Sequence, residues 1–394
     1  MKISNLQLKI ESDSVILSAD CSIRHFGPDK VYFKFNKKYL DFIALDMSPF
    51  AAALLIPSMK LGSDLVIEGE ISEELYIGMH KIMERLLSWN IGLKKIAITA
   101  TSLKKDTYRG TATASFFSGG VDSFYTYLKN KVDNEREKIK YFILANGYDI
   151  SLGNKKLWEQ SLGTVENVAK QENIELITVE SNIRNLIEPI ISWGYSHGGC
   201  LAALGLCLRK ELREVLVAST NCYDSLEYWG SHPDIDHFWS TETITFNHDG
   251  AEATRLEKVK FIGNNPLVLE NLRVCYLNKR NKFNCGHCEK CLRTMTSLYI
   301  AGSLEKSKTF PSIVDIENVR NTDIKDEYIF NRENMVELEK LGINPELEAI
   351  LREKLQKKYE PNSIIMNGVK KIWFYDYFYT RSSLYGLISL IRKI

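Results

Sequence analysis

The chain has almost no net charge: its 394 residues include 51 lysines and arginines against 50 aspartates and glutamates, which leaves +1 at pH 7. Without a strong field of one sign, nothing draws the whole protein to nucleic acid or to an anionic membrane. No stretch approaches the roughly 18 consecutive apolar residues of a membrane-spanning helix. The first residues alternate instead of forming the apolar run of a signal peptide. We therefore expect a cytoplasmic protein without a nucleic-acid partner or a membrane span.

Cysteine is uncommon over most of the chain, and four of the eight cysteines gather between positions 275 and 291. Their spacing, Cys-x₉-Cys-x₂-Cys-x₂-Cys, supplies the four thiolates of a closed tetrahedral zinc site, whereas a redox pair needs only two cysteines. Such a site leaves no open coordination position, so the zinc ion would be structural. His287 is the alternative to one of these ligands. The predicted zinc ligands are Cys275, Cys285, Cys288 and Cys291.

Hydrophobic patterning divides the chain into three parts. Residues 1–108 are expected to form an α+β accessory domain, because strand-like runs precede an amphipathic helical pattern. Residues 109–302 alternate strands and helices, which is typical of a parallel sheet with helices on both faces. Residues 303–394 lack strand signals and are expected to form a helical extension. Its aromatic tail, Lys370–Ile394, is expected either to pack on the core or a second subunit or to lie at a membrane surface.

The expected elements follow from these periodicities. The strands are Ile3–Ile10, Ser14–Cys21, Lys30–Phe35, Tyr39–Leu45, Asp64–Glu70, Lys94–Ala100, Thr113–Phe117, Ile139–Asn146, Ile174–Val179 and Glu214–Ser219. The helices are Ile71–Trp89, Asp122–Lys131, Leu157–Glu172, Gly199–Leu212, Asn334–Leu341 and Pro345–Tyr359. Ligands of parallel sheets sit beyond the carboxyl ends of the strands, so the residues after each strand from position 113 onward are the candidates for a site.

The most selective stretch is Ser118-Gly119-Gly120-Val121-Asp122-Ser123, between an expected strand and an expected helix. Two glycines let the backbone turn tightly and approach an anion, and the helix points its free N–H groups and positive dipole end into that turn. Ser118 and Ser123 add hydroxyl donors, and Asp122 can hold Mg²⁺ beside phosphates. The alternative is a strand–turn–helix corner whose glycines serve only the turn. Five specified positions in this context favour a site for the pyrophosphate half of ATP.

At these residues the chain resembles the PP-loop ATP pyrophosphatases, which split ATP between the α- and β-phosphates. Together with the cysteine cluster, in this order, it resembles one branch of them over residues 112–300, the 7-cyano-7-deazaguanine synthases. The resemblance implies a Rossmann-like parallel five-stranded sheet, ATP and Mg²⁺ as cofactors, and zinc on the four cysteines. It also implies a reaction in which a carboxylate is adenylated and ammonia displaces AMP, with a second activation that converts the amide into a nitrile. Similar proteins with added terminal regions occur in bacterial antiviral gene clusters.

Three stretches match the family more loosely. The family has a Tyr-Gly-Gln-Arg turn where this chain has residues 146–149, and a Gly-Tyr-Pro-Asp stretch where this chain has residues 230–234. Lys258 matches a lysine upstream of the cysteines and is expected to reach the ATP phosphates. These departures predict an acceptor that differs from the family's. Asn146 and Gly147 are expected to contact the nucleotide, and the expected substrate contacts are Tyr148, Asp149, His197 and Asp234, with Asp236 as a further carboxylate.

The expected reaction activates a carboxylate as an acyl-adenylate, keeps the pyrophosphate in the loop and forms an amide or nitrile with ammonia or an amine. The acid and the amine can be small molecules or groups borne by a protein, and the sequence is compatible with a homodimer. For each loop carboxylate the alternative role is a solvated turn former. The expected catalytic residues are Ser118, Asp122, Ser123 and Lys258.

Three other functions remain as alternatives. A tRNA-thiolating enzyme would use cysteines near the nucleotide, for which Cys200 and Cys222 are candidates, although the net charge argues against RNA binding. A glutamine-dependent amidotransferase is disfavoured, because residue 2 is Lys2 and Cys21 is the only cysteine among residues 1–100. A non-catalytic nucleotide-binding subunit would keep the loop and release no pyrophosphate. Outside the zinc cluster, Cys207 and the other three cysteines are expected to be buried free thiols.

Overall fold

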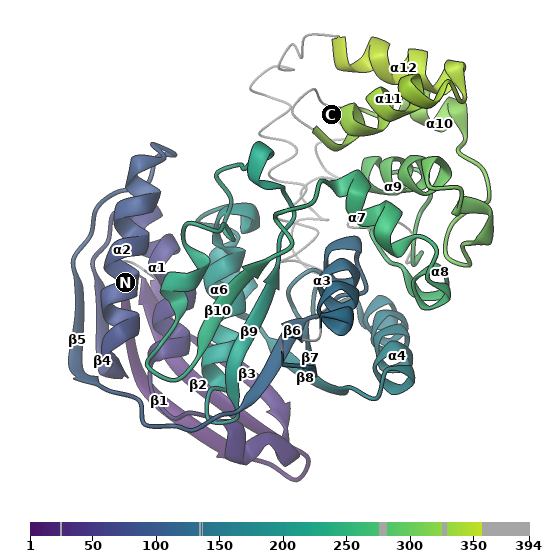
Figure 1. Cartoon of the computed structure of the whole chain (residues 1–394). Helices are drawn as coiled ribbons and strands as arrows, with labels where there is room; N and C mark the ends of the chain where they lie inside the picture. Colours follow the sequence, from purple (N-terminus) through teal and green to yellow (C-terminus); the bar gives the residue numbers. More distant parts are fainter. Residues whose placement is uncertain (24–25, 134, 136, 276–281, 325–328, 357–394) are drawn as a thin grey trace, which may run out of the picture.

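Ten strands form one mixed β-sheet in the computed structural model, which describes residues 1–23, 26–133, 135, 137–275, 282–324 and 329–356. The sheet order is β10-β9-β6-β7-β8-β3-β2-β1-β4-β5, with helices against it (Figure 1). The strands are β1 (Lys2–Ile10), β2 (Ser14–Ile23), β3 (Phe26–Asn36), β4 (Leu65–Ser72), β5 (Ile98–Lys104), β6 (Ala112–Phe116), β7 (Ile139–Asn146), β8 (Glu175–Ser181), β9 (Leu212–Ala218) and β10 (Thr245–Asp249). The α-helices are α1 (Ser48–Leu61), α2 (Glu73–Ser88), α3 (Val121–Val132), α4 (Lys155–Gln171), α5 (Ile183–Ile187), α6 (Trp193–Cys207), α7 (Arg255–Ile262), α8 (Pro266–Asn271), α9 (Glu289–Ile300), α10 (Ile316–Asn321), α11 (Ile329–Leu341) and α12 (Pro345–Gln356).

The strands β10, β9, β6, β7 and β8 are parallel to one another and form one end of the sheet. Within this parallel half of the sheet, β6 is the first strand in the chain and lies in the centre. β7 and β8 follow on one side of it, and the chain then crosses back to add β9 and β10 on the other. The loops that follow β6 and β9 lead away in opposite directions, which leaves a crevice at the carboxyl ends of these two strands. Most residues of β6 and β7 are buried, as expected for strands that are covered on both faces.

The first 104 residues extend this same sheet. β3 pairs antiparallel with β8, with Phe33 opposite Ser181 and Phe35 opposite Val179. Beyond β3, β2 and β1 continue antiparallel, and β4 and β5 follow in parallel. The expected five-stranded sheet is therefore wrong in extent, because five parallel strands form half of a ten-stranded mixed sheet. The sheet continues across the proposed boundary at residue 108, and the three-part division stays a prediction.

Two apolar cores pack on this sheet, and a third lies among the last helices. The first core joins both halves of the chain, since it contains Phe33 and Leu65 as well as Val179 and Leu206. The second core contains residues of α3, α4, α7 and α9 together with the four clustered cysteines. The third core is built by α10, α11 and α12 with residues of α7 and α9. The C-terminal helices are thus attached to the sheet through α7 and α9, as Figure 1 shows.

Two local expectations fail between β3 and β4. The segment expected as a strand over Tyr39–Leu45 contains a 3₁₀ helix over Lys37–Phe42. Asn36 starts this turn, because its Oδ1 accepts a hydrogen bond from the backbone N of Lys38 at 3.0 Å. The helix α1 was not predicted. All its residues from Ser48 to Met59 are buried, so it lacks the amphipathic period that marks a surface helix.

The expected helical extension is present within residues 303–356. The predicted helix Asn334–Leu341 lies inside α11, and the predicted helix from Pro345 matches α12 as far as Gln356. The last residues of that prediction and the tail Lys370–Ile394 lie outside the described residues.

A buried ion cluster connects the first part of the chain to the helix α6. Arg209, just beyond α6, is fully buried, and its guanidinium binds the carboxylates of Asp46 and Asp106. Arg209 Nε lies 2.6 Å from Asp106 Oδ2. Asp46 precedes α1, and Asp106 lies between β5 and β6. One arginine therefore neutralises two acids that come from segments far apart in the sequence.

Replacing Arg209 with glutamine should lower the free energy of unfolding by about 3–5 kcal/mol, because two buried carboxylates lose their counter-charge. The matched control is R213Q, which breaks an ion pair with Glu137 in which both side chains are half-exposed. That control should cost about 1 kcal/mol or less. Urea unfolding followed by circular dichroism measures both variants. A loss for R209Q no larger than that for R213Q would contradict the assignment.

Candidate functional site

The glycine loop lies at the crevice beside β6. β6 ends at Phe116 and α3 begins at Val121, and Gly119 between them has a φ of +74°, a left-handed conformation that favours glycine. The N-cap of α3 is Gly120, and no side chain in the described part of the chain caps this helix. The first N–H groups of α3 are therefore left without a side-chain acceptor, which is the arrangement that binds phosphate at a helix start. Ser123 Oγ donates to the carbonyl of Gly120 at 3.0 Å.

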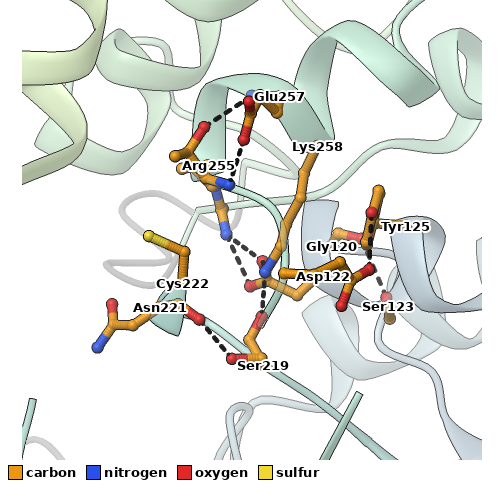
Figure 2. Close-up of polar contacts among 12 residues, drawn as sticks. Gly120, Asp122, Ser123, Tyr125, Ser219, Asn221, Cys222, Arg255, Glu257 and Lys258 are labelled. Carbon is orange, nitrogen blue, oxygen red and sulfur yellow. Dashed lines mark hydrogen bonds and ion pairs between the residues drawn. The ribbon is translucent and has the colours of Figure 1, made fainter. Parts of the chain in front are cut away.

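Asp122, which we expected to be available for Mg²⁺, is held in an ion pair (Figure 2). Arg255 Nη1 lies 2.6 and 2.7 Å from its two carboxylate oxygens, and Lys258 Nζ lies 3.8 Å from one of them. Lys258 is fully buried and donates to the carbonyl of Ser219 at 2.7 Å. Burial lowers the pKa of Lys258, and the Asp122 carboxylate opposes that change. The acid is therefore shared by two cations directly beside the loop.

Arg255 was not among the predicted site residues. The start of α7 carries a capping box, in which Thr254 Oγ1 accepts from the backbone N of Glu257 at 3.2 Å and Glu257 Oε2 accepts from the backbone N of Thr254 at 2.8 Å. This fixes the first turn, so that Arg255 and Lys258, three residues apart, both extend from α7 to Asp122 (Figure 2). The Thr-x-x-Glu signature is visible in the sequence and would have predicted this helix start.

A cavity of about 220 Å³ opens beside the loop. Several predicted site residues, which lie far apart in the sequence, meet in the wall of this cavity. The predicted residues in its wall are Ser118, Asp122, Ser123, Tyr148, Asp149 and His197. Wall residues that sequence reasoning missed include Trp158, Trp193, Trp229 and Arg273, whereas Thr220 directly follows an expected strand. Three of the chain's six tryptophans are among them.

Besides Asp236, which lies behind the wall, four predicted residues outside the glycine loop do not line this cavity. Gly147 has a φ of +93°, and a Cβ there would lie 2.1 Å from the carbonyl O of Ser181, so glycine is needed for the turn itself. Asn146 Oδ1 is buried without a hydrogen-bond partner. Asp234 is half-exposed and lies 3.5 Å from Arg85, away from the cavity wall. The four residues are Asn146, Gly147, Asp234 and Lys258.

Aromatic rings form part of the cavity wall. Tyr148 Oη donates to the carbonyl of Cys200 at 2.8 Å, and burial raises the pKa of Tyr148 well above its usual value. Tyr148 is therefore a neutral group whose hydroxyl is already engaged, and its ring is what it offers to a ligand. Trp193 meets this ring edge-on, with the ring centroids 5.0 Å apart. Flat apolar surfaces of this kind favour a planar ligand.

His197 is held between two of these tryptophans, with ring centroids 6.2 Å from Trp193 and 6.0 Å from Trp229. Its Nδ1 lies 3.1 Å from the carbonyl O of Gly194 and donates to it, which leaves the lone pair of the neutral ring on Nε2. Burial lowers the pKa of His197 below its ordinary value of 6.5. A neutral imidazole in a cavity wall is suited to accept a proton.

An acid–imidazole pair lies behind the wall. Asp236 Oδ2 accepts from Ser231 Oγ at 2.6 Å and lies 2.7 Å from His248 Nδ1. Ser231 lines the cavity, whereas the side chains of Asp236 and His248 are buried behind it. Asp236 therefore acts on the cavity by orienting the Ser231 hydroxyl.

The four predicted cysteines form a buried cluster that can bind a metal such as zinc, with all sulfur atoms within 4.8 Å of one another. The Sγ atoms of Cys275 and Cys288 are 3.9 Å apart, and those of Cys285 and Cys291 are 3.8 Å apart. Four sulfurs bound at about 2.3 Å to one tetrahedral zinc ion are about 3.8 Å apart, so the donor set fits zinc. Hydrogen bonding with Cys275 raises the pKa of Cys288 to about 12, and a bound cation would favour the thiolate form.

Neighbouring residues fix the loops that carry this cluster. Asn284 Oδ1 accepts from the backbone N of Val274 at 2.9 Å and from that of Cys275 at 3.3 Å. His287, the alternative ligand, is exposed and does not belong to the cluster, so four cysteines form the donor set. The other cysteines are buried free thiols as expected, namely Cys21, Cys200, Cys207 and Cys222. Burial raises the pKa of Cys200, which makes it a poor nucleophile.

No family model, curated protein or solved structure matches this chain. Within the part of the chain that the structure describes, no helix has both the length and the apolar character needed to cross a bilayer.

The purified protein should carry about one zinc ion per chain, and C291S should lose it, because three thiolates and a hydroxyl hold zinc much less tightly. The melting temperature should fall at the same time, since metal binding stabilises the folded loops. The matched control is C21S, which changes an equally buried thiol in β2 outside the cluster. Metal analysis should find zinc unchanged in C21S. Wild-type protein with much less than one equivalent of any bound metal would contradict the assignment.

The imidazole of His197 should titrate below pH 6.5 and carry its proton on Nδ1 at neutral pH, because burial disfavours the charged ring. Nitrogen-detected NMR of histidine-labelled protein measures both properties. The resonance that disappears in H197Q identifies His197 among the seven histidines. A midpoint at or above 6.5, or a proton on Nε2, would be inconsistent with this environment.

Proposed function

We propose that the protein is an ATP-dependent C–N ligase that activates a carboxylate as an acyl-adenylate and transfers the acyl group to ammonia or an amine. One observation carries this proposal. The uncapped start of α3, with its glycine turn, lies in the same wall as a neutral histidine and a set of aromatic rings. An anion site for phosphate and a proton acceptor thus meet in one cavity. The resemblance to PP-loop ATP pyrophosphatases of the 7-cyano-7-deazaguanine synthase type, and the strand order of a Rossmann-like sheet, support the same function.

The loop residues would hold the phosphates of ATP. The N–H groups at the start of α3 and the hydroxyl of Ser118 supply hydrogen-bond donors, and the dipole of α3 favours the negative charge. Arg255 and Lys258 place two positive charges beside the loop. Bound Mg²⁺ would neutralise phosphate charge, and Asp122 is the carboxylate placed to hold it. Because Asp122 accepts two hydrogen bonds from Arg255, we infer that Arg255 turns to the phosphates when Asp122 takes a metal ion.

The two chemical steps balance without a further reactant. In the first, a carboxylate oxygen attacks the α-phosphorus, the bond from that phosphorus to the bridging oxygen breaks, and pyrophosphate leaves with the negative charge. In the second, the amine nitrogen attacks the acyl carbon, the bond from that carbon to the AMP oxygen breaks, and AMP leaves. The nitrogen must lose one proton, and His197 Nε2 is the neutral acceptor in the wall.

The wall also suggests the class of acid. Tyr148, Trp193 and Trp229 present apolar ring surface, while Asp149 adds a charged group next to them. Such a wall suits a planar acid, whether free or borne by a protein, with polar groups at its edge. We propose that this part of the cavity, in which the chain departs from the family pattern, selects the acceptor.

Incubation with Mg·ATP and a library of aromatic carboxylic acids should yield AMP, pyrophosphate and an acyl-adenylate detected by mass spectrometry. D122N should reduce pyrophosphate release by about 100-fold, because it removes the carboxylate that is placed to hold the Mg²⁺ at the reacting phosphates. C222S is the control: Cys222 lies near Lys258 in Figure 2 but has no part in the proposed chemistry.

Each alternative function has its own outcome in this experiment. ATP binding without pyrophosphate release for any acid would favour a non-catalytic nucleotide-binding subunit. Loss of activity in C222S would favour the thiolating enzyme.

A further inference from the structure

Arg273 lies between the glycine loop and the cysteine cluster and contacts both. Its backbone N donates to the carbonyl O of Gly119 at 2.8 Å. Its Nη2 donates to the carbonyl O of Cys275 at 3.2 Å, and Cys275 is one of the four clustered cysteines. A single residue therefore links the turn that would hold phosphate to the loop that can hold zinc.

The side chain of Arg273 is buried and yet belongs to the cavity wall. It is 8% exposed and lines the cavity together with Ser118 and Ser123 of the loop. Among the described residues of that wall, Arg273 is the only arginine or lysine. Arg255 and Lys258 lie outside the wall and are directed to Asp122. A phosphate that entered the cavity would thus meet the positive charge of Arg273 first.

We propose that Arg273 is a phosphate-binding residue of the nucleotide site and that the cysteine cluster positions it. A guanidinium offers paired N–H donors that match phosphate oxygens, and it keeps its charge when buried. The proposal rests on the proposed function in one respect, which is that the phosphate belongs to ATP.

The positioning half of the proposal follows from how residues 272–275 are held. Asn284, next to Cys285 in the cluster, donates from Nδ2 to the carbonyl of Leu272 at 2.9 Å and accepts from the backbone N of Val274 and Cys275. A metal ion on Cys275 and Cys285 fixes both ends of this arrangement. When the ion is released, Cys275 is no longer fixed. Arg273, which binds the carbonyl of Cys275, then also loses its fixed position, and with it the hydrogen bond from its backbone N to the carbonyl of Gly119.

The test compares R273Q with R293Q. Arg293 is 5% exposed and also lies two residues from a cluster cysteine, but it does not line the cavity. The probes are Mg·ATP and inorganic pyrophosphate, each titrated calorimetrically into the full-length protein, with zinc content and circular dichroism measured on every sample. R273Q should keep its zinc and bind both probes at least about tenfold more weakly, because charged hydrogen bonds to phosphate are lost. R273K should fall between R273Q and the wild type, and R293Q should stay within about twofold of the wild type.

Several outcomes would overturn the phosphate-binding half of the proposal. Binding of both probes by R273Q within about twofold of the wild type would do so. Loss of zinc in both R273Q and R273K would assign Arg273 to holding the cluster. Wild-type protein that binds pyrophosphate but not ATP would refute the proposed function and leave the comparison at Arg273 intact.

The positioning half has a separate measurement. Removing zinc from the wild type with a chelator should weaken the binding of Mg·ATP by about the same factor as R273Q, and adding zinc back should restore it. Unchanged ATP binding by folded, zinc-free protein would overturn this half.

Discussion

The reversal of strand order at β6 is the constraint on which the candidate site depends. β7 lies on one side of β6, and β9 lies on the other. The loops after β6 and β9 therefore lead in opposite directions, and the carboxyl end of β6 stays uncovered. The glycine turn fills that position, and the loop after β7 and the loop after β9 supply Asp149 and Thr220 to the same cavity. The cavity wall is therefore a consequence of topology, and the residue types in it decide the chemistry.

Near this turn, two cations share one carboxylate. Asp122 sits between Arg255 and Lys258, and Lys258 also binds a backbone carbonyl, so neither cation is left buried without an acceptor. An isolated buried charge would cost several kcal/mol. Under the proposed function, a bound phosphate would offer these cations new acceptors in place of Asp122.

β3 and α11 pack against the elements that carry the candidate site. On one side, β3 covers the edge of β8, which would otherwise present unpaired backbone groups. On the other side, α11 holds α7, because Glu333 Oε2 accepts from the backbone N of Leu256 at 3.0 Å and the ring of Phe330 lies 5.8 Å from the guanidinium carbon of Arg255. α11 therefore helps to position Arg255, and neither β3 nor α11 contributes a described residue to the cavity wall.

The sequence alone determined the local features whose signals are contiguous: the glycine turn between β6 and α3, the four-cysteine spacing, and the alternation of strands and helices from β6 to β9. It could not determine that β3 pairs with β8, because a strand pattern does not specify which free edge the strand will cover. It missed α1, whose uniform burial removes the helical period, and it left out Arg255 and Arg273, whose neighbours are distant in the sequence. It included Asp234, which the folded chain places beside Arg85 and away from the cavity. Tertiary structure decided these points because hydrogen-bonded edges and charge pairs join residues more than 100 positions apart, and no local pattern carries that information.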